Sequence, residues 1–163
     1  MAATTVTMAR TAWPSGASEQ FAAADAFEEL AGAIAEPLVI RVPAGRAFAD
    51  PVVIEHRIDE GGIMAAPVLI VETGADSEVS IVQRFSGPDD VDVLVLPIVE
   101  LRVAAAARVS YLGVNQIGRS GWLIANQHAV SEQDSTIYLE RVARGSLRPG
   151  AHRRRGRRPR RLG

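Results

Sequence analysis

The chain has 163 residues, 47% of them hydrophobic, which is enough for one domain with a substantial core. It contains no cysteine, which excludes disulfides, thiolate nucleophiles and cysteine-ligated metal or iron–sulfur sites. The formal net charge of −1 hides a partition: residues 1–143 carry 9 Arg and 19 acidic residues, a balance of −10, and residues 144–163 carry 9 Arg and no acid, a balance of +9.

No targeting or membrane segment stands out. No uncharged run approaches the ~18 apolar residues that a membrane helix needs, and no signal-type apolar stretch follows Arg10. We therefore expect a cytoplasmic protein without a membrane partner, and the lack of cysteine fits a reducing compartment.

Residues 1–20 carry little pattern and are expected to be disordered or frayed. Helical spacing already begins at residue 18 and predicts a helix over 18–35 that ends before Pro37. The expected exposed face carries Asp25, Glu28 and Glu29. The expected apolar face carries Phe21, Ala24, Phe27, Ala31 and Ile34.

After Pro37 the signals are β almost throughout, and Gly, Pro and Asp separate the segments. Pro97 is expected to bend a long strand or mark a sheet edge. Short strands divided by such residues are typical of an all-β solenoid, sandwich or barrel. The predicted strands are 38–42, 52–58, 67–72, 78–85, 91–103, 109–117, 122–130 and 136–142.

A short β-type phrase recurs and favours the solenoid. It occupies residues 79–82, 109–112 and 136–139, so that its starts lie 30 and then 27 residues apart. A strand signal with this period indicates stacked coils that cannot bury their apolar faces alone. Such coils need small residues at their corners. The alanines 104–107 are predicted to form such a corner, with a short helical turn as the alternative.

The three histidines show no metal-ligand spacing. His56 lies on a predicted strand, His128 lies four residues before Glu132, and His152 lies in the arginine tail. A structural or surface role is therefore favoured for each of them.

Asp89, Asp90 and Asp92 form the densest acidic cluster. Paired carboxylates can act as general acid and base, as in a carbohydrate-active β-helix. The cluster follows Gly87 and Pro88, however, where Asp is a turn former, and this interpretation is favoured. The chain has no lysine and no nucleotide-binding glycine motif, so a P-loop is excluded.

Residues 144–163 form a basic tail that is expected to be disordered. One hypothesis is nucleic-acid binding through phosphate contacts, although the tail has no aromatic residue to stack on bases. The favoured alternative is that the tail is read out of frame, since a GC-rich gene read in this way yields Arg, Gly, Pro and Ala.

Four phrases resemble the SufB/SufD family of iron–sulfur cluster assembly proteins, and SufD more than SufB. Each is short and none is a catalytic signature, but they follow the family's order and spacing over about three quarters of the chain. The first departs from the family pattern at its Leu and Asn positions. The phrases are 21–27; 39–45 with 50–54; 67–72 with Ala75 and 80–85; and 100–103 with Ala106 and 108–111.

This resemblance implies a right-handed parallel β-helix over residues 21–143 that acts as a scaffold and not as an enzyme. It implies a SufB-like partner and a SufC-like ATPase, with the cluster and ATP handled by the complex. No catalytic, metal or cofactor residue can be carried over to this chain. Family members are much longer, so we expect residues 21–143 to be an incomplete core that lacks the ATPase-binding region.

Overall fold

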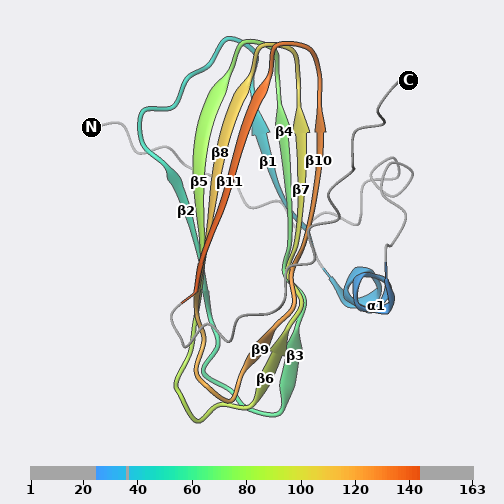
Figure 1. Ribbon diagram of the computed structural model, residues 1–163, viewed down its shortest axis with the longest axis vertical. Coiled ribbons are helices and arrows are strands. Elements are labelled where there is room, and N and C mark those ends of the chain that lie inside the picture. The colour runs from blue at the N-terminus through green and yellow to red at the C-terminus, as the bar shows by residue number, and fades with distance from the viewer. Residues whose placement is uncertain (1–24, 36, 144–163) are drawn as a thin grey trace, which may run out of the picture.

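The computed structural model describes residues 25–35 and 37–143. Over these residues the chain winds into a β-solenoid of about four stacked coils, with one short helix against its side (Figure 1). The predicted parallel β-helix is thus confirmed. The predictions for the frayed N-terminus and for the basic tail at 144–163 fall on residues outside the described part.

Each complete coil adds one strand to each of three parallel sheets. The first sheet has the order β1-β4-β7-β10, the second β11-β8-β5-β2 and the third β3-β6-β9. The first and second sheets face each other in Figure 1 and enclose the lumen, and the third closes one end of each coil. Coil 1 comprises β1 (Pro37–Val42), β2 (Val52–Arg57) and β3 (Ile63–Ala65); coil 2 β4 (Val68–Thr73), β5 (Glu78–Ser86) and β6 (Val93–Val95); coil 3 β7 (Ile98–Val103), β8 (Arg108–Gln116) and β9 (Trp122–Leu123); coil 4 β10 (Asn126–Ser131) and β11 (Thr136–Ala143).

The strand register explains the recurring phrase and corrects it by one residue. Val79 pairs with Val109, and Val109 pairs with Ile137, so the repeat is 30 and then 28 residues. The expected spacing of 27 placed Thr136 opposite Val109 and was wrong. A slip of one residue would have turned every side chain of β11 to the opposite face of the sheet.

The corner between the first and second sheets repeats in all four coils. Its third residue adopts a left-handed backbone conformation each time, with φ between 54° and 67°. Backbone hydrogen bonds connect these residues to the corner of the next coil, for example from Asp76 N to Ala105 O at 3.0 Å. The alanines 104–107 form this corner in coil 3, as predicted, and are not a helical turn. The four left-handed residues are Gly45, Asp76, Ala106 and Asp134.

Side chains that alternate toward the lumen form the main core. Valine, leucine and isoleucine dominate it, which accounts for a stable stack with few aromatic residues. The strands β4 and β7 are buried on both faces. On their outer side, Val68, Ile70 and Ile98 belong to one apolar cluster with Ala31 of α1. The lumen cluster comprises Ile40, Val42, Ile54, Leu69, Val71, Val79, Ile81, Val99, Leu101, Val103, Ala107, Val109 and Tyr111.

Two predicted long strands are each divided by a corner. The segment 91–103 forms β6 and β7, and Pro97 marks the bend between them, as expected. The segment 122–130 forms β9 and β10, and the short strand β3 was not predicted. The corners that follow the third sheet contain buried apolar residues such as Leu96, so they lack the polar turn signals on which strand prediction depends.

The helix α1 (Ala26–Ile34) lies outside the first sheet (Figure 1). Asp25 caps it through Oδ1, which accepts hydrogen bonds from the backbone N–H groups of Phe27 and Glu28 at 2.9 Å. Asp25 itself is extended, so the helix starts at residue 26 and not at 18, and residues 18–24 lie outside the described part. Ala31 is buried as predicted, but the predicted faces were otherwise partly wrong: Glu28 is buried, whereas Phe27 and Ile34 are 43% and 51% exposed.

Candidate functional site

The fourth coil leaves strand edges and apolar side chains open. Within the described part of the chain, β10 pairs only with β7, and β11 pairs only with β8. Exposed strand edges with apolar groups are typical of surfaces that dock another chain. The exposed large apolar residues of this region are Trp122, Val130, Tyr138, Leu139 and Val142, of which Trp122 is 70% exposed.

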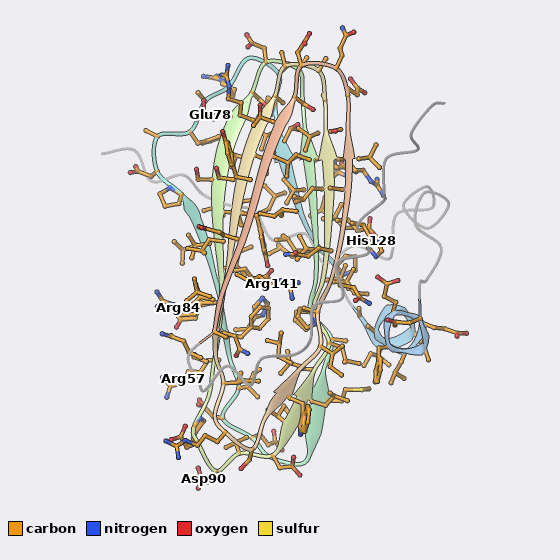
Figure 2. All side chains as sticks on the ribbon, in the orientation of Figure 1. Arg57, Glu78, Arg84, Asp90, His128 and Arg141 are labelled. Carbon is orange, nitrogen blue, oxygen red and sulfur yellow. The ribbon has the colours of Figure 1, made fainter. Side chains whose placement is uncertain are left out.

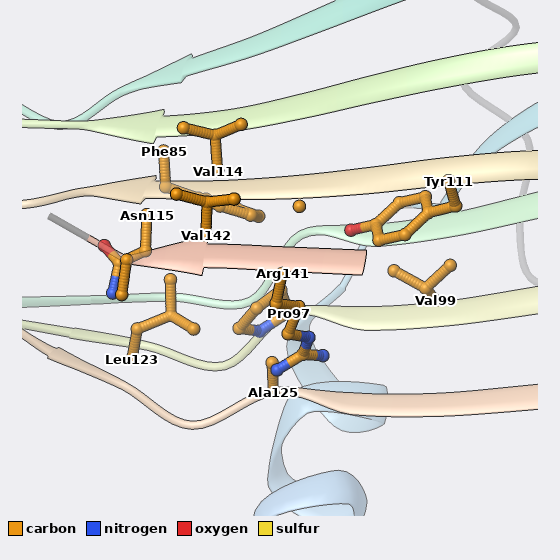
Figure 3. A pocket seen from close by; sticks show the side chains of 12 residues that line it. Phe85, Pro97, Val99, Tyr111, Val114, Asn115, Leu123, Ala125, Arg141 and Val142 are labelled. Carbon is orange, nitrogen blue, oxygen red and sulfur yellow. The ribbon is translucent and has the colours of Figure 1, made fainter. Parts of the chain in front are cut away.

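A cavity of about 500 Å³ opens in the lumen between the third and fourth coils (Figure 3). Its size lies within the usual range for small-molecule pockets. Its walls are largely apolar and include Phe85, Val99 and Leu123. Among the described residues, the polar side chains that line it come from Tyr111, Asn115 and Arg141, and none of the lining residues is acidic.

A chain of hydrogen-bonded polar groups runs from Tyr111, at the cavity, through coil 2 to coil 1. The Tyr111 hydroxyl donates to Gln83 Oε1 at 2.7 Å, and Gln83 Nε2 lies 2.9 Å from His56 Nε2. Because the amide nitrogen donates, His56 Nε2 is the acceptor and the neutral ring carries its proton on Nδ1. Burial lowers the pKa of His56, which agrees with this neutral form. The ring of His56 also stacks on Phe85, with centroids 4.8 Å apart.

Arg141 and Tyr111 interact electrostatically across the cavity. Burial raises the pKa of Tyr111 to about 12, and the positive charge of Arg141 offsets part of this rise. Figure 2 shows Arg141 between the two facing sheets. Among the described residues Arg141 has no ion-pair partner, so an unpaired cation lies at a cavity whose walls are largely apolar.

A second polar cluster holds α1 against the first sheet. Glu28 of α1 contacts His128 of β10 through Oε1 and Nε2, which joins residues 100 positions apart in the chain. Glu100 precedes His128 in the same outward row and is only 2% exposed. Burial raises the pKa of Glu100, and the charges of Arg102 and His128 oppose that rise.

Arg102 connects this cluster to an outward row of ion pairs. Its Nη2 lies 3.2 Å from Glu100 Oε2, and its Nη1 lies 3.0 Å from Glu72 Oε1. Arg41 reaches the other oxygen of Glu72 at 2.8 Å. Alternating charges on neighbouring coils thereby link coils 1, 2 and 3, and the contact between Glu28 and His128 extends the network to coil 4 and α1.

The structure separates the residues that the sequence singled out. His56 lies in the lumen and His128 lies on the outer face of the first sheet, whereas His152 falls outside the described residues. Asp89, Asp90 and Asp92 are exposed near the corner between β5 and β6, and none of them lines the cavity. Figure 2 places Asp90 at the far end of the molecule from the corner that carries Glu78.

His56 and His128 each join a polar cluster whose other members were not recognised as site residues from the sequence. Glu100, Gln83 and Tyr111 each lie on a predicted strand, where a polar residue reads as surface-facing. The only available signal was the alternation along the strand. Gln83 and Tyr111 lie two residues from apolar positions that face inward, so their own side chains face inward too.

In the described ranges, no group of three or more His, Asp or Glu side chains is arranged to hold a metal ion. The helix within these ranges is too short and too polar to cross a membrane. Comparisons with protein-family models, with curated proteins and with solved structures each give no match.

Proposed function

We propose that this chain is a non-catalytic scaffold subunit in iron–sulfur cluster assembly, similar to SufD. The proposal rests on the four family-like phrases and on their positions in the coils. The phrase at 39–45 spans the end of β1 and its corner, the one at 67–72 spans most of β4, and the one at 100–103 lies within β7. A parallel β-helix is the architecture that the resemblance implies. A fold alone does not define a function, so the phrases and the open fourth coil carry the proposal.

The open edge of coil 4 supports a docking role. A scaffold must offer a partner an unpaired surface, and the exposed Tyr138 and Val142 on β11 supply apolar area beside free backbone groups. The partner proposed for this edge is a SufB-like subunit. The cluster and ATP would be handled by that subunit and by a SufC-like ATPase, in the cytoplasm.

Co-purification with a SufB-like subunit tests the proposal. We expect the whole chain to retain this subunit, and Val142→Asp to weaken the complex at least about tenfold, since a charge would face an apolar partner surface. The matched control is Val53→Asp, which changes an exposed valine of similar accessibility on β2 in the first coil. Absence of binding, or equal losses in both variants, would contradict the proposed role or the proposed surface.

A further inference from the structure

The cavity between coils 3 and 4 is lined at one lumen position by a residue without a side chain, Gly113. Ile54, Gln83, Gly113 and Arg141 occupy the same inward row of the second sheet in successive coils. Gly113 therefore leaves a gap between Gln83 and Arg141. A methyl group at Gly113 would meet the ring of Tyr111 at 3.4 Å and Arg141 Cγ at 3.5 Å, so the gap is bounded by these two side chains.

The groups at this gap are hydrogen-bond donors without matching acceptors. The Arg141 guanidinium has no carboxylate partner in the described part of the chain. Gln127 follows Val99 in the inward row of the first sheet. Its side chain interacts with Tyr111, and its buried Nε2 has no acceptor at ordinary hydrogen-bond distance among the described residues. Asn115 uses its Oδ1 to accept from the backbone N–H of Ile117 at 3.1 Å, which leaves its amide N–H groups available.

We propose that this cavity binds a small apolar anion, namely a carboxylate on an aromatic or short aliphatic body. A carboxylate matches the planar guanidinium of Arg141 with two parallel hydrogen bonds. The walls formed by Phe85, Val99 and Leu123 would take up the apolar body. No acidic side chain of the described ranges lines the cavity, so none of them would repel the anion there.

Two fluorescent probes that share one apolar body test the charge requirement. 8-Anilinonaphthalene-1-sulfonate carries an anionic group, and N-phenyl-1-naphthylamine is the same molecule without it. We expect both to bind the full chain saturably at one site, and 1-naphthoate to displace the anionic probe. Arg141→Gln should weaken the anionic probe about tenfold or more, and should change the neutral probe by less than about twofold.

Two further variants separate the cavity from the exposed edge. Gly113→Val should weaken both probes at least about tenfold, because its side chain occupies the gap. Arg108→Gln removes an exposed arginine from the start of β8, away from the cavity, and should leave both probes unchanged. Thermal melting of each variant, with and without 1-naphthoate, shows whether the fold is retained: the carboxylate should raise the Tm of the parent chain and of Arg108→Gln only.

Three results would overturn the proposal. One is the absence of saturable binding of either probe. The second is an equal loss of the anionic probe in Arg141→Gln and Arg108→Gln, which would indicate general attraction to positive charge. The third is undiminished binding by folded Gly113→Val, which would place the probes on the open strand edges. None of these results depends on whether a SufB-like subunit binds.

Discussion

The middle coils and the fourth coil each place a strand in the first and second sheets in the same register, yet the burial of these strands differs sharply. In the first sheet β4 and β7 are almost entirely buried, whereas β10 has no fully buried residue. In the second sheet β11 is exposed over most of its length. Burial in a solenoid therefore comes from the neighbouring coils and from α1, and not from the strand itself. The fourth coil is thus an end of the stack with an exposed surface.

A matched pair of leucines gives the largest expected contrast. Leu101 on β7 is 1% exposed, and Leu139 on β11 is 43% exposed although it shares an inward row with Tyr111. We expect Leu101→Ala to lower the free energy of unfolding by about 2–5 kcal/mol, because it leaves a cavity in a packed core. Leu139→Ala should cost only about 1 kcal/mol, since nearly half of the residue is already exposed.

Urea denaturation of both variants measures the difference, with the m value checked for constancy. Equal losses in the two variants would show that the fourth coil is as well packed as the third, and would remove the basis of the comparison.

A matched pair of glutamines tests the polar groups of the lumen. Gln83→Leu should cost about 2–3 kcal/mol, because the Tyr111 hydroxyl and His56 Nε2 would be left buried without their partner. Gln127→Leu should change stability by less than about 1 kcal/mol, since the Nε2 atom that it removes interacts only weakly with Tyr111 and has no acceptor at ordinary hydrogen-bond distance among the described residues.

The double variant Gln83→Leu with Tyr111→Phe tests the coupling in this chain of hydrogen bonds. Its loss should be smaller than the sum of the two single losses, because each partner's removal already breaks the same hydrogen bond. Strict additivity would show that the Tyr111–Gln83 contact contributes nothing to stability.

Alkaline titration tests whether coil 4 packs as the structure shows. The folded pKa of Tyr111 is about 12, above the unfolded value near 10, so stability is complete below pH 10 and falls as the pH rises toward 12. The loss across this window is roughly 2–3 kcal/mol, and Tyr111→Phe should abolish it. The chain has no lysine or cysteine, so few other groups titrate in this window.

Arg141→Gln should raise the pKa of Tyr111 further, since the guanidinium favours the phenolate. Ultraviolet absorbance in a Tyr138→Phe background follows Tyr111 alone, because the chain has two tyrosines. An unchanged pKa in Arg141→Gln would mean that β11 does not hold its arginine over the lumen.

The sequence was sufficient to predict the solenoid, and two residues show why. Val79 and Val109 start equivalent phrases one coil apart, and a period of this length follows directly from the geometry of a stacked coil. Pro97 also marked its corner correctly. The corner at Ile124 and Ala125 carried no turn signal, so β9 and β10 were predicted as one strand.

The polar groups of the lumen and of the α1 contact could not be predicted in this way. Glu28 reads as an exposed helix residue, and only the tertiary contact with His128, 100 residues later, explains its burial. Gly113 reads as a weak point in a strand, whereas in the coil it opens a cavity. The burial of Glu28 and the cavity at Gly113 both depend on which residues of successive coils lie side by side. The sequence pattern predicts this pairing with an error of one residue, since it placed Thr136 and not Ile137 opposite Val109.

The corner residues give the smallest contrast. Ala106 adopts φ 57° in coil 3, and Asp134 adopts φ 59° at the equivalent position of coil 4. A left-handed conformation costs alanine roughly 1–2 kcal/mol, whereas Asp tolerates it through its short polar side chain. Ala106→Gly should therefore raise the free energy of unfolding by about 0.5–1 kcal/mol, after the larger unfolded-state entropy of glycine is subtracted. Asp134→Gly should change it by less than about 0.5 kcal/mol. Thermal melts of the two variants compare these effects directly. A loss of stability in Ala106→Gly would mean that the corner of coil 3 relaxes away from the left-handed conformation. The backbone hydrogen bonds between successive corners would then be interrupted in the middle of the stack.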